Sequence, residues 1–305
     1  MRTDPCDRKS TRRHHGDIGA ARTAPEPTAD PAPPPAAGSP ALYRAVAAGS
    51  FRRYSTYRAA TLAGAFTNTV FGFVLAYTFL ALWRARPGLG GYDTAQAVTF
   101  IWISQALLAT VAVFGGGFQD DIQERFRTGD IAIDLYRPVD FQGWWLAGDL
   151  GRAAFHLLAR GIAPALAGAL AFHLRIPRDP LVWGAFLLSV LLAVVVSFGL
   201  RFLVALTGFW LHDSDGVRAL VLVVTLFFSG MLLPITLFPG PLGTAAAVLP
   251  FSGLIQIPAD ILLGHRTGPA AATGLAFQLA WALALVALGR AVLAAATRKV
   301  VVQGG

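Results

Sequence analysis

The sequence predicts an all-α polytopic membrane protein with six transmembrane helices. Hydrophobic residues make up 55% of the 305 residues and charged residues only 14%, whereas soluble chains carry about 25% charged residues. The charged residues lie mostly in gaps between apolar runs of about 20 residues, the length that crosses a bilayer as a helix. This pattern excludes an ordinary soluble domain.

The first 40 residues are predicted to form a disordered cytoplasmic tail. They contain RKSTRRHH and then PEPTADPAPPPAAGSP, with almost no large apolar side chain to bury. Arg12 and Arg13 resemble a twin-arginine export signal, but no apolar region follows them before residue 41, so a cleaved signal is not expected. Cys6 is the only cysteine, which excludes a disulfide within the chain and a cysteine-based metal site.

Residues 41–58, ALYRAVAAGSFRRYSTYR, predict an amphipathic helix lying along the membrane, because they combine several arginines with apolar residues. Its cations are expected near lipid phosphates: Arg44, Arg52, Arg53 and Arg58. The six spans come after this helix, at about residues 59–83, 96–117, 153–174, 181–203, 217–237 and 270–293.

The distribution of cations predicts the orientation. The net charge of +8 arises largely beside the apolar runs, which argues against a nucleic-acid binder, whose cations gather on one soluble face. Lysines and arginines are more numerous in the segments that share a side with the amino terminus than in those opposite. The positive-inside rule then puts both termini, and the segment between spans two and three, in the cytoplasm.

That segment, residues 118–143, is the most polar stretch between spans. Phe118, Ile122 and Phe126 recur every four residues and share one face of a short helix, while Gln119 and Asp121 lie on the other. An amphipathic helix of this kind lies flat at a membrane surface. Three residues are expected to shape the end of the helix and the chain beyond it: Gly129 ends the helix, Asp130 caps the next turn and Pro138 directs the chain back to the bilayer.

Residues 238–269 contain apolar pieces too short to cross a membrane. Prolines interrupt them, among them Pro250 and Pro258. This pattern predicts a re-entrant or interfacial hairpin on the outer side, with Gln256 and Asp260 on its polar face. The alternative is one longer irregular loop.

Several polar side chains fall within the predicted spans. Arg152, His156 and Arg160 are spaced by four at the start of span three, so they face either the bundle interior or, by snorkelling, the headgroups. Asn68 and Gln105 lie midway along spans one and two. All but Arg152 are candidates for lining a pathway, although contact between helices is the commoner role of such groups as Asn68 and Gln105.

The chain resembles the permease subunits of ABC-2 type transporters over about residues 45–300. The motif RTGDIAIDLYRPVD at 127–140 is similar to the stretch that comes after their second span, with Gly129, Leu135, Arg137 and Pro138 at the matching places. LTGFWLHDSDGVRAL at 206–220 and LLPITLFPGPLGTAAAVLPFSGLIQIPADILLG at 232–264 resemble the connection before span five and the outer hairpin. The order of these motifs identifies 41–300 as an ABC-2 type transmembrane domain.

The resemblance implies one half of an exporter in the plasma membrane. Such a chain pairs with a second permease copy or a sister permease and with separate ABC ATP-binding subunits, which hold ATP and Mg²⁺. The polar segment is then a coupling helix that meets the ATPase through eight residues: Asp121, Glu124, Arg125, Arg127, Gly129, Asp130, Arg137 and Pro138.

The residues themselves agree that ATP must be bound elsewhere. A phosphate-binding loop needs a lysine after a glycine-rich turn, but Lys9 follows Arg8 and Lys299 follows Arg298. No histidine pair has metal-site spacing, and no serine, histidine and acid arrangement suggests hydrolysis. The chain is therefore predicted to bind no cofactor and no metal and to have no catalytic residue, with lipid as its surroundings.

Two other functions stay open at this point. An ion-gradient-driven secondary transporter would need inverted repeats and an acidic residue buried in a span, and neither is clear in the sequence. A structural or enzymatic membrane protein without a transport role would have no ATPase that purifies with it.

Overall fold

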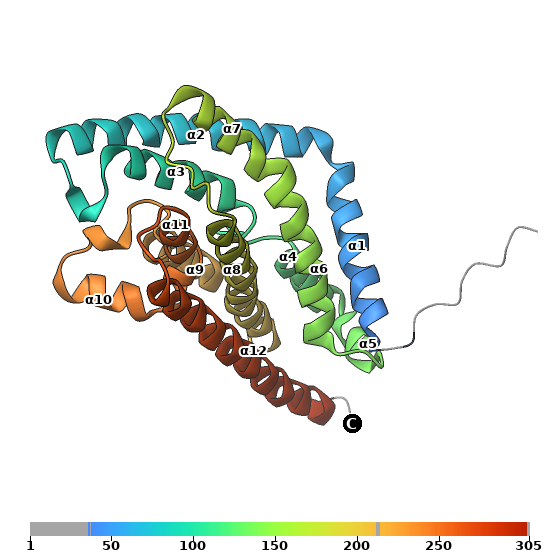
Figure 1. Ribbon diagram of the computed structural model, residues 1–305. Helices are drawn as coiled ribbons and strands as arrows, with labels where there is room; N and C mark the ends of the chain where they lie inside the picture. The colour runs from blue at the N-terminus through green and yellow to red at the C-terminus, as the bar shows by residue number, and fades with distance from the viewer. Residues whose placement is uncertain (1–35, 37, 212–213, 304–305) are drawn as a thin grey trace, which may run out of the picture. The chain divides into compact units, whose positions relative to one another are not determined.

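The computed structural model describes residues 36, 38–211 and 214–303, and the regular elements in this part of the chain are all helices (Figure 1). The predicted tail therefore lies almost wholly outside the described residues. Four of the described helices are long and apolar enough to cross a membrane: Arg58–Ala85, Phe141–Ala171, Pro180–Phe209 and Pro269–Arg298. This agrees with the predicted class of a polytopic helical membrane protein, and the number of six spans stays a prediction.

Helices distant in sequence lie side by side (Figure 1). The packed groups are α1 (Pro40–Thr56) with α6 (Phe141–His156), α2 (Arg58–Ala85) with α3 (Thr94–Leu108) and α7 (Ile162–Ala171), and α8 (Pro180–Leu206) with α12 (Pro269–Gln303). The α1–α6 contact is so close that a Cβ added at Gly151 would lie 2.0 Å from the carbonyl oxygen of Ala47. Only glycine allows the two backbones to approach in this way.

Trp102 of α3 joins α2 and α7. A Cβ at Gly72 of α2 or at Gly168 of α7 would lie 2.7 or 2.4 Å from the indole ring, so each glycine leaves the space that the ring fills. Trp102 is fully buried with Phe100 and Ile101 in the main core. Small residues facing a large aromatic ring are a usual way to pack helices when lipid gives no hydrophobic driving force.

Helix starts are set by their capping residues. Ser39 and Pro40 begin α1, Asp179 and Pro180 begin α8, and the side chains of Ser39 and Asp179 each accept a backbone hydrogen bond. Asp93 forms a capping box at the start of α3, because its side chain and that of Gln96 each accept a backbone hydrogen bond from the other residue.

At two predicted spans the helix ends before the expected carboxyl end of the span. Span two, expected at 96–117, ends as a helix at Leu108, because the next residues turn and three successive glycines, Gly115 to Gly117, have positive φ. Span five, expected at 217–237, is the helix α9 (Asp215–Phe228), which a left-handed Gly230 follows. Both helices are shorter than a bilayer-spanning length of about 20 residues.

Span three begins earlier than expected. Asp140 caps α6 by accepting a hydrogen bond from the Gly143 amide at 2.5 Å, and the helix then continues through a π-turn at Leu157–Gly161 into α7. The helix therefore begins before residue 153, where span three was expected to start, and includes Trp144 and Trp145. The point at which this helix enters the membrane stays a prediction.

The region of the predicted outer hairpin consists of short helices, so the alternative of a long irregular loop is wrong. They are η4 (Ile235–Leu237), α10 (Gly240–Val248), η5 (Pro250–Gly253) and α11 (Gln256–Leu262). Pro250 is buried at the start of η5. Gln256 and Asp260 do not form the expected polar face, because both are buried and bond to the Tyr92 hydroxyl.

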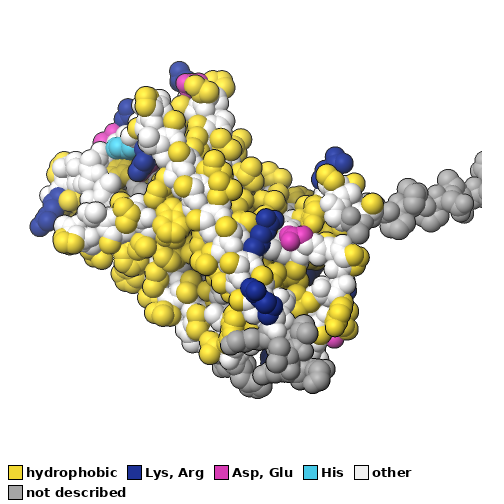
Figure 2. Space-filling view, turned by 90° about the horizontal axis from the view of Figure 1, so that it is seen from below, with side chains coloured by type: hydrophobic (Ala, Val, Ile, Leu, Met, Phe, Trp, Pro, Cys, Tyr) yellow, Lys and Arg dark blue, Asp and Glu magenta, His cyan; other side chains and the backbone are white. Residues whose placement is uncertain are grey.

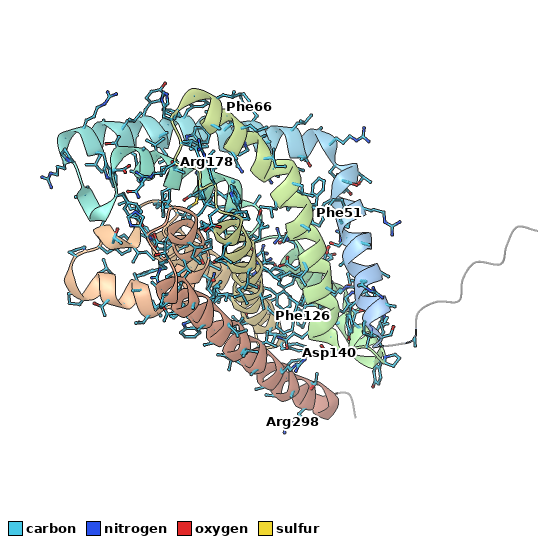
Figure 3. All side chains as sticks on the ribbon, in the orientation of Figure 1. Phe51, Phe66, Phe126, Asp140, Arg178 and Arg298 are labelled. Carbon is cyan, nitrogen blue, oxygen red and sulfur yellow. The ribbon has the colours of Figure 1, made fainter. Side chains whose placement is uncertain are left out.

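The outer surface of the helices is apolar. Figure 2 shows one face on which hydrophobic side chains cover most of the area and charged side chains are few. Large side chains such as Phe66 of α2 are exposed (Figure 3), with Phe66 at 71%. An apolar surface this extensive is unusual for a soluble protein and suits contact with lipid.

Candidate functional site: the α4–α5 surface and the charges behind it

The predicted amphipathic helix is α4 (Phe118–Thr128). Gly129, with φ of 82°, ends it as expected. Asp120 and Asp121 occupy the first turn and Arg125 and Arg127 the last, which is the arrangement that complements the helix dipole. The local sequence therefore stabilises α4 at both ends.

The apolar face of α4 packs against the end of α8 and against η3 (Thr207–Phe209). The ring centroids of Phe118 and Phe198 are 4.9 Å apart, and those of Phe126 and Phe209 4.6 Å. A Cβ at Gly208 would lie 2.6 Å from the Phe126 ring, so this glycine makes room for it. Gln119, expected on the polar face, is buried instead and donates to the carbonyl oxygen of Arg201.

Ion pairs connect the polar face of α4 to two other helices. Arg53 of α1 binds both carboxylate oxygens of Asp121, at 2.8 and 3.1 Å, and Arg218 of α9 lies 2.5 Å from Asp120. The hydrogen bond and the charge of Asp121 raise the pKa of Arg53 above its ordinary value. Arg53 was expected near lipid phosphates, but its guanidinium is held by α4.

The short helix α5 (Ile131–Tyr136) comes after α4 and is fixed to it by Asp134. Two arginines meet this buried carboxylate, Arg125 at 2.6 Å and Arg137 at 3.2 Å. Both arginines were predicted to contact a partner, whereas Asp134 was not singled out. Figure 1 shows α5 where α1 and α6 begin.

The remaining predicted residues of this region are exposed. Glu124 and Arg127 form a loose pair at 3.8 Å, and Gly129, Asp130 and Pro138 also face outward. Asp130 stands at the N-cap of α5, but its side chain makes no capping hydrogen bond, so its predicted capping role is wrong. The α4–α5 surface is hereafter the set Glu124, Arg127, Asp130, Tyr136 and Arg137.

Tyr136 is the residue on this surface that sequence reasoning missed. It is 89% exposed, the largest exposed fraction among the exposed large hydrophobic side chains. Tyrosine is enriched where proteins bind one another, because its rigid ring supplies contact area at little cost in conformational entropy. Its place within RTGDIAIDLYRPVD, between charged residues, could have marked it.

Behind α4 lies a triad of buried charges, Asp149, Arg152 and Arg201. Asp149 of α6 has no exposed side-chain surface; one carboxylate oxygen lies 2.6 Å from Arg152 Nε and the other 2.5 Å from an amino nitrogen of Arg201 in α8. Arg152 also donates to the carbonyl oxygens of Ala109 and Thr110, at 2.7 and 2.9 Å, in the turn before α4. The triad thus joins α6, α8 and that turn.

The other polar residues of the predicted spans are dispersed. Asn68 Nδ2 lies 3.5 Å from the carbonyl oxygen of Gln105, and both side chains are buried, as expected of a contact between helices. His156 packs against the Tyr54 ring, and the half-buried guanidinium of Arg160 fills the space beside Gly64. Arg152 faces the interior rather than the headgroups.

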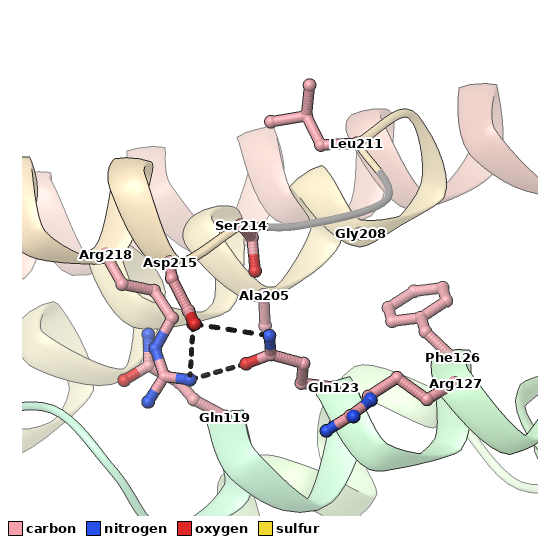
Figure 4. A pocket seen from close by; sticks show the side chains of 10 residues that line it. All are labelled: Gln119, Gln123, Phe126, Arg127, Ala205, Gly208, Leu211, Ser214, Asp215 and Arg218. Atoms are coloured by element: carbon pink, nitrogen blue, oxygen red, sulfur yellow. Dashed lines mark hydrogen bonds and ion pairs between the residues drawn. The ribbon is translucent and has the colours of Figure 1, made fainter.

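A cavity of about 510 Å³ opens beside α4, between it and the connection from α8 to α9 (Figure 4). Gln123, Asp215 and Arg218 meet in it: the Gln123 amide donates to Asp215 and accepts from Arg218, at 3.4 and 2.5 Å. Figure 4 shows Phe126 and Arg127 at its other side. The polar contacts of α4 with α9 are therefore next to an open space.

The described residues thus include long apolar helices and an amphipathic helix, α4, that packs on α8. A comparison with protein families gives the relationship of the chain. The family described as ABC-2 family transporter protein matches residues 54–304. The chain belongs to this family. No curated protein and no solved structure matches it.

Membership makes this ABC-2 family transporter protein a membrane transport component, and its apolar helices indicate a multi-pass membrane protein. The match includes the α4–α5 surface and the triad. Asp149 is the buried acid that a secondary transporter would need and that the sequence did not reveal. Two arginines already occupy its oxygens, however, so a transported cation would meet fixed positive charges there.

Proposed function

We propose that the chain is the permease subunit of an ATP-driven exporter and forms half of its translocation pathway. It couples to a separate ABC ATP-binding subunit through the α4–α5 surface, and that subunit holds ATP and Mg²⁺. A second copy of the chain, or a sister permease, completes the pathway. The family match carries this proposal, since permeases of this kind take their energy from a partner.

The chemistry of the α4–α5 surface supports its role as the contact. Charges of both signs surround an exposed aromatic ring, with Glu124 and Arg127 on α4 and Tyr136 on α5. Protein interfaces combine a buried aromatic anchor with a charged rim in this way. Arg137 is also half-exposed, so it can meet a partner while it holds Asp134.

The contacts behind the surface support transmission as a rigid-body movement. The ion pair from Asp121 to Arg53 joins α4 to α1, and the hydrogen bond from Gln119 to the Arg201 carbonyl joins α4 to α8. A push on α4 would therefore move α1 and α8 together rather than bend a loop. ATP binding that closes the partner subunits would tilt the two permeases about their interface.

The proposed orientation rests on charge. The plasma membrane is the proposed location, with both termini and the α4–α5 surface in the cytoplasm, because the segments on that side carry more arginines. This orientation brings α4 to the compartment that contains ATP. Cysteines introduced at Asp130 and Arg178 would react with a membrane-impermeant reagent from opposite sides.

The coupling proposal is tested by reversing charge and removing the ring on the α4–α5 surface. We expect Arg127→Glu with Tyr136→Ser to reduce retention of the partner ABC ATP-binding subunit by about tenfold or more, since hot-spot residues each contribute about 2 kcal/mol. Retention is measured by co-purification, and substrate-stimulated ATPase activity in liposomes is measured in parallel.

Arg178→Glu is the matched control. Arg178 is exposed in the connection between α7 and α8 and lies far from Phe126 and Asp140 (Figure 3). The control should leave retention unchanged. Equal retention by the double variant and by the control would remove the coupling assignment, and transport by the purified chain alone would remove the ATP-driven function.

A further inference from the structure

A second cavity, of about 300 Å³, lies between α8, α9 and the turn that precedes α4. Its apolar walls come from residues such as Leu200, Val204 and Leu222. Its polar end is formed by Ser197, Arg201 and Gln119, with Arg218 and Asp215 also at its wall. The volume is at the lower end of small-molecule sites, which start at about 300 Å³.

Arg201 lines this cavity and has a side-chain donor that no described residue accepts from. Its side chain is 6% exposed, its Nε lies 3.1 Å from Ser197 Oγ, and one amino nitrogen binds Asp149. The other amino nitrogen is buried and has no hydrogen-bond partner among the described residues. A buried charged donor without a partner is costly, so a ligand that accepts from it would be strongly favoured.

The charge balance around Arg201 also favours an anion. Asp149 neutralises only one of the two guanidinium groups that bind it, those of Arg152 and Arg201, so the triad keeps a net positive charge away from water. Arg218 also lines the cavity, but nearby acids offset its charge, so the net positive charge comes from the triad. The acids near Arg218 are Asp120, at 2.5 Å, and Asp215, at 3.6 Å, and both are mostly exposed.

The shape of the donor group selects an oxyanion. A guanidinium presents parallel N–H donors that match phosphate or carboxylate oxygens, and it does so best where water is excluded. The apolar walls on α8 and α9 continue from this polar end, so a ligand that is charged at one end and apolar at the other would fit both parts of the cavity.

We propose that this cavity binds the phosphate-bearing headgroup of an anionic amphiphile, with its apolar part along α8 and α9. Arg201 donates to the phosphate from inside and Arg218 from the cavity wall. A role of this amphiphile as transported substrate rests on the proposed function. Binding itself does not, because it requires no ATPase.

The test uses the full chain purified in a neutral detergent and native mass spectrometry. Phosphatidylglycerol is compared with phosphatidylcholine of the same acyl chains, and inorganic phosphate is added as a competitor in a separate arm. We expect the anionic lipid to bind at least about tenfold more tightly, since a hydrogen bond to a charged group changes affinity by about that factor. Inorganic phosphate is expected not to displace it.

Two variants remove different features of the cavity. Arg201→Lys keeps the ion pair with Asp149 but loses the free guanidinium donor, and Leu222→Trp fills the apolar part while leaving the triad intact. Each should weaken binding of phosphatidylglycerol about tenfold. Arg290→Gln removes an exposed cation of α12 that does not line the cavity and should leave binding unchanged.

The outcomes separate the sources of the phosphate. If inorganic phosphate displaced phosphatidylglycerol and bound with equal affinity, the proposal of an amphiphilic ligand would be overturned and the site would be assigned to the free ion. Equal binding of both lipids, or binding that neither variant weakens, would overturn the site. If lipid binds as expected while no ABC ATP-binding subunit associates, the site stands and the proposed exporter function fails.

Discussion

Two buried polar clusters hold different ends of the fold together by different means. The triad of Asp149, Arg152 and Arg201 uses full charges, with both carboxylate oxygens within 2.6 Å of a guanidinium nitrogen. The hairpin cluster of Tyr92, Gln256 and Asp260 uses mostly neutral donors, since the Tyr92 hydroxyl and the Gln256 amide share one oxygen of Asp260.

The difference is in how each cluster responds to the loss of one member. In the triad, loss of the carboxylate would leave two guanidinium groups buried and uncompensated. In the hairpin cluster, loss of the tyrosine hydroxyl leaves Asp260 with the Gln256 amide and with Arg266, whose Nε lies 3.5 Å away. Buried charges thus make a rigid but vulnerable joint, whereas neutral donors make one that tolerates change.

Asp149→Asn should have the largest effect on stability. It leaves Arg152 and Arg201 without a counterion, and breaking a buried ion pair costs about 3–5 kcal/mol. We expect a large fall in the unfolding temperature of the detergent-solubilised chain, measured by intrinsic fluorescence, and a low yield from membranes.

Asp93→Asn is the control for this substitution. Asp93 pairs with Arg175 at 2.8 Å, but both side chains are about half exposed or more, and asparagine caps α3 equally well. An exposed pair contributes about 0–1 kcal/mol. A loss at Asp149 no larger than that at Asp93 would contradict the view that the triad joins α6 and α8.

Tyr92→Phe should have an intermediate effect. The ring keeps its packing on Phe100, while Asp260 loses a hydrogen bond of 2.5 Å, so we expect a cost of about 1–3 kcal/mol. Tyr77→Phe, at a tyrosine that is 62% exposed, is the control and should be nearly neutral. Thermal unfolding of the two variants at neutral pH measures the difference.

The same cluster predicts a dependence on alkaline pH. Burial, and then the charge of Asp260, raise the pKa of the Tyr92 hydroxyl above its ordinary value. Because the folded-state pKa is above the unfolded one, the stabilisation is complete below about pH 10 and is lost as the pH rises further. Between about pH 8 and pH 11 the wild type should therefore lose more stability than Tyr92→Phe. Parallel losses would assign the alkaline change to other groups.

Local sequence patterns predicted helix α4 better than they predicted either of the two buried clusters. The four-residue spacing of Phe118, Ile122 and Phe126 and the stop at Gly129 depend on neighbours in sequence, and both are confirmed. Asp149 and Arg201 are 52 residues apart, so no local pattern could connect them.

The hairpin cluster escaped prediction for the same reason. Tyr92 and Asp260 are 168 residues apart in sequence. Sequence reasoning therefore assigned Asp260 to a polar face, because an isolated acid in a proline-broken segment is usually exposed. The helix ends of α3 and α9 were missed because apolar residues continue beyond the turns that end them.

The smallest effect on stability is expected at the exposed pair of Glu124 and Arg127. These side chains are 65% and 73% exposed and 3.8 Å apart, so Glu124→Gln should change the free energy of unfolding by less than about 0.5 kcal/mol. At low salt, the Glu124→Gln variant should nevertheless associate with the ABC ATP-binding subunit more slowly than the wild type, because charges at the rim of an interface steer encounter. This difference between variant and wild type should shrink as salt is added. Biolayer interferometry in low and in high salt measures the association rates of the variant and the wild type. A change in association rate that does not depend on salt, or a loss of stability like that at Asp149, would mean that Glu124 acts within the fold. The view that some charges of α4 stabilise the fold while others meet a partner would then be wrong.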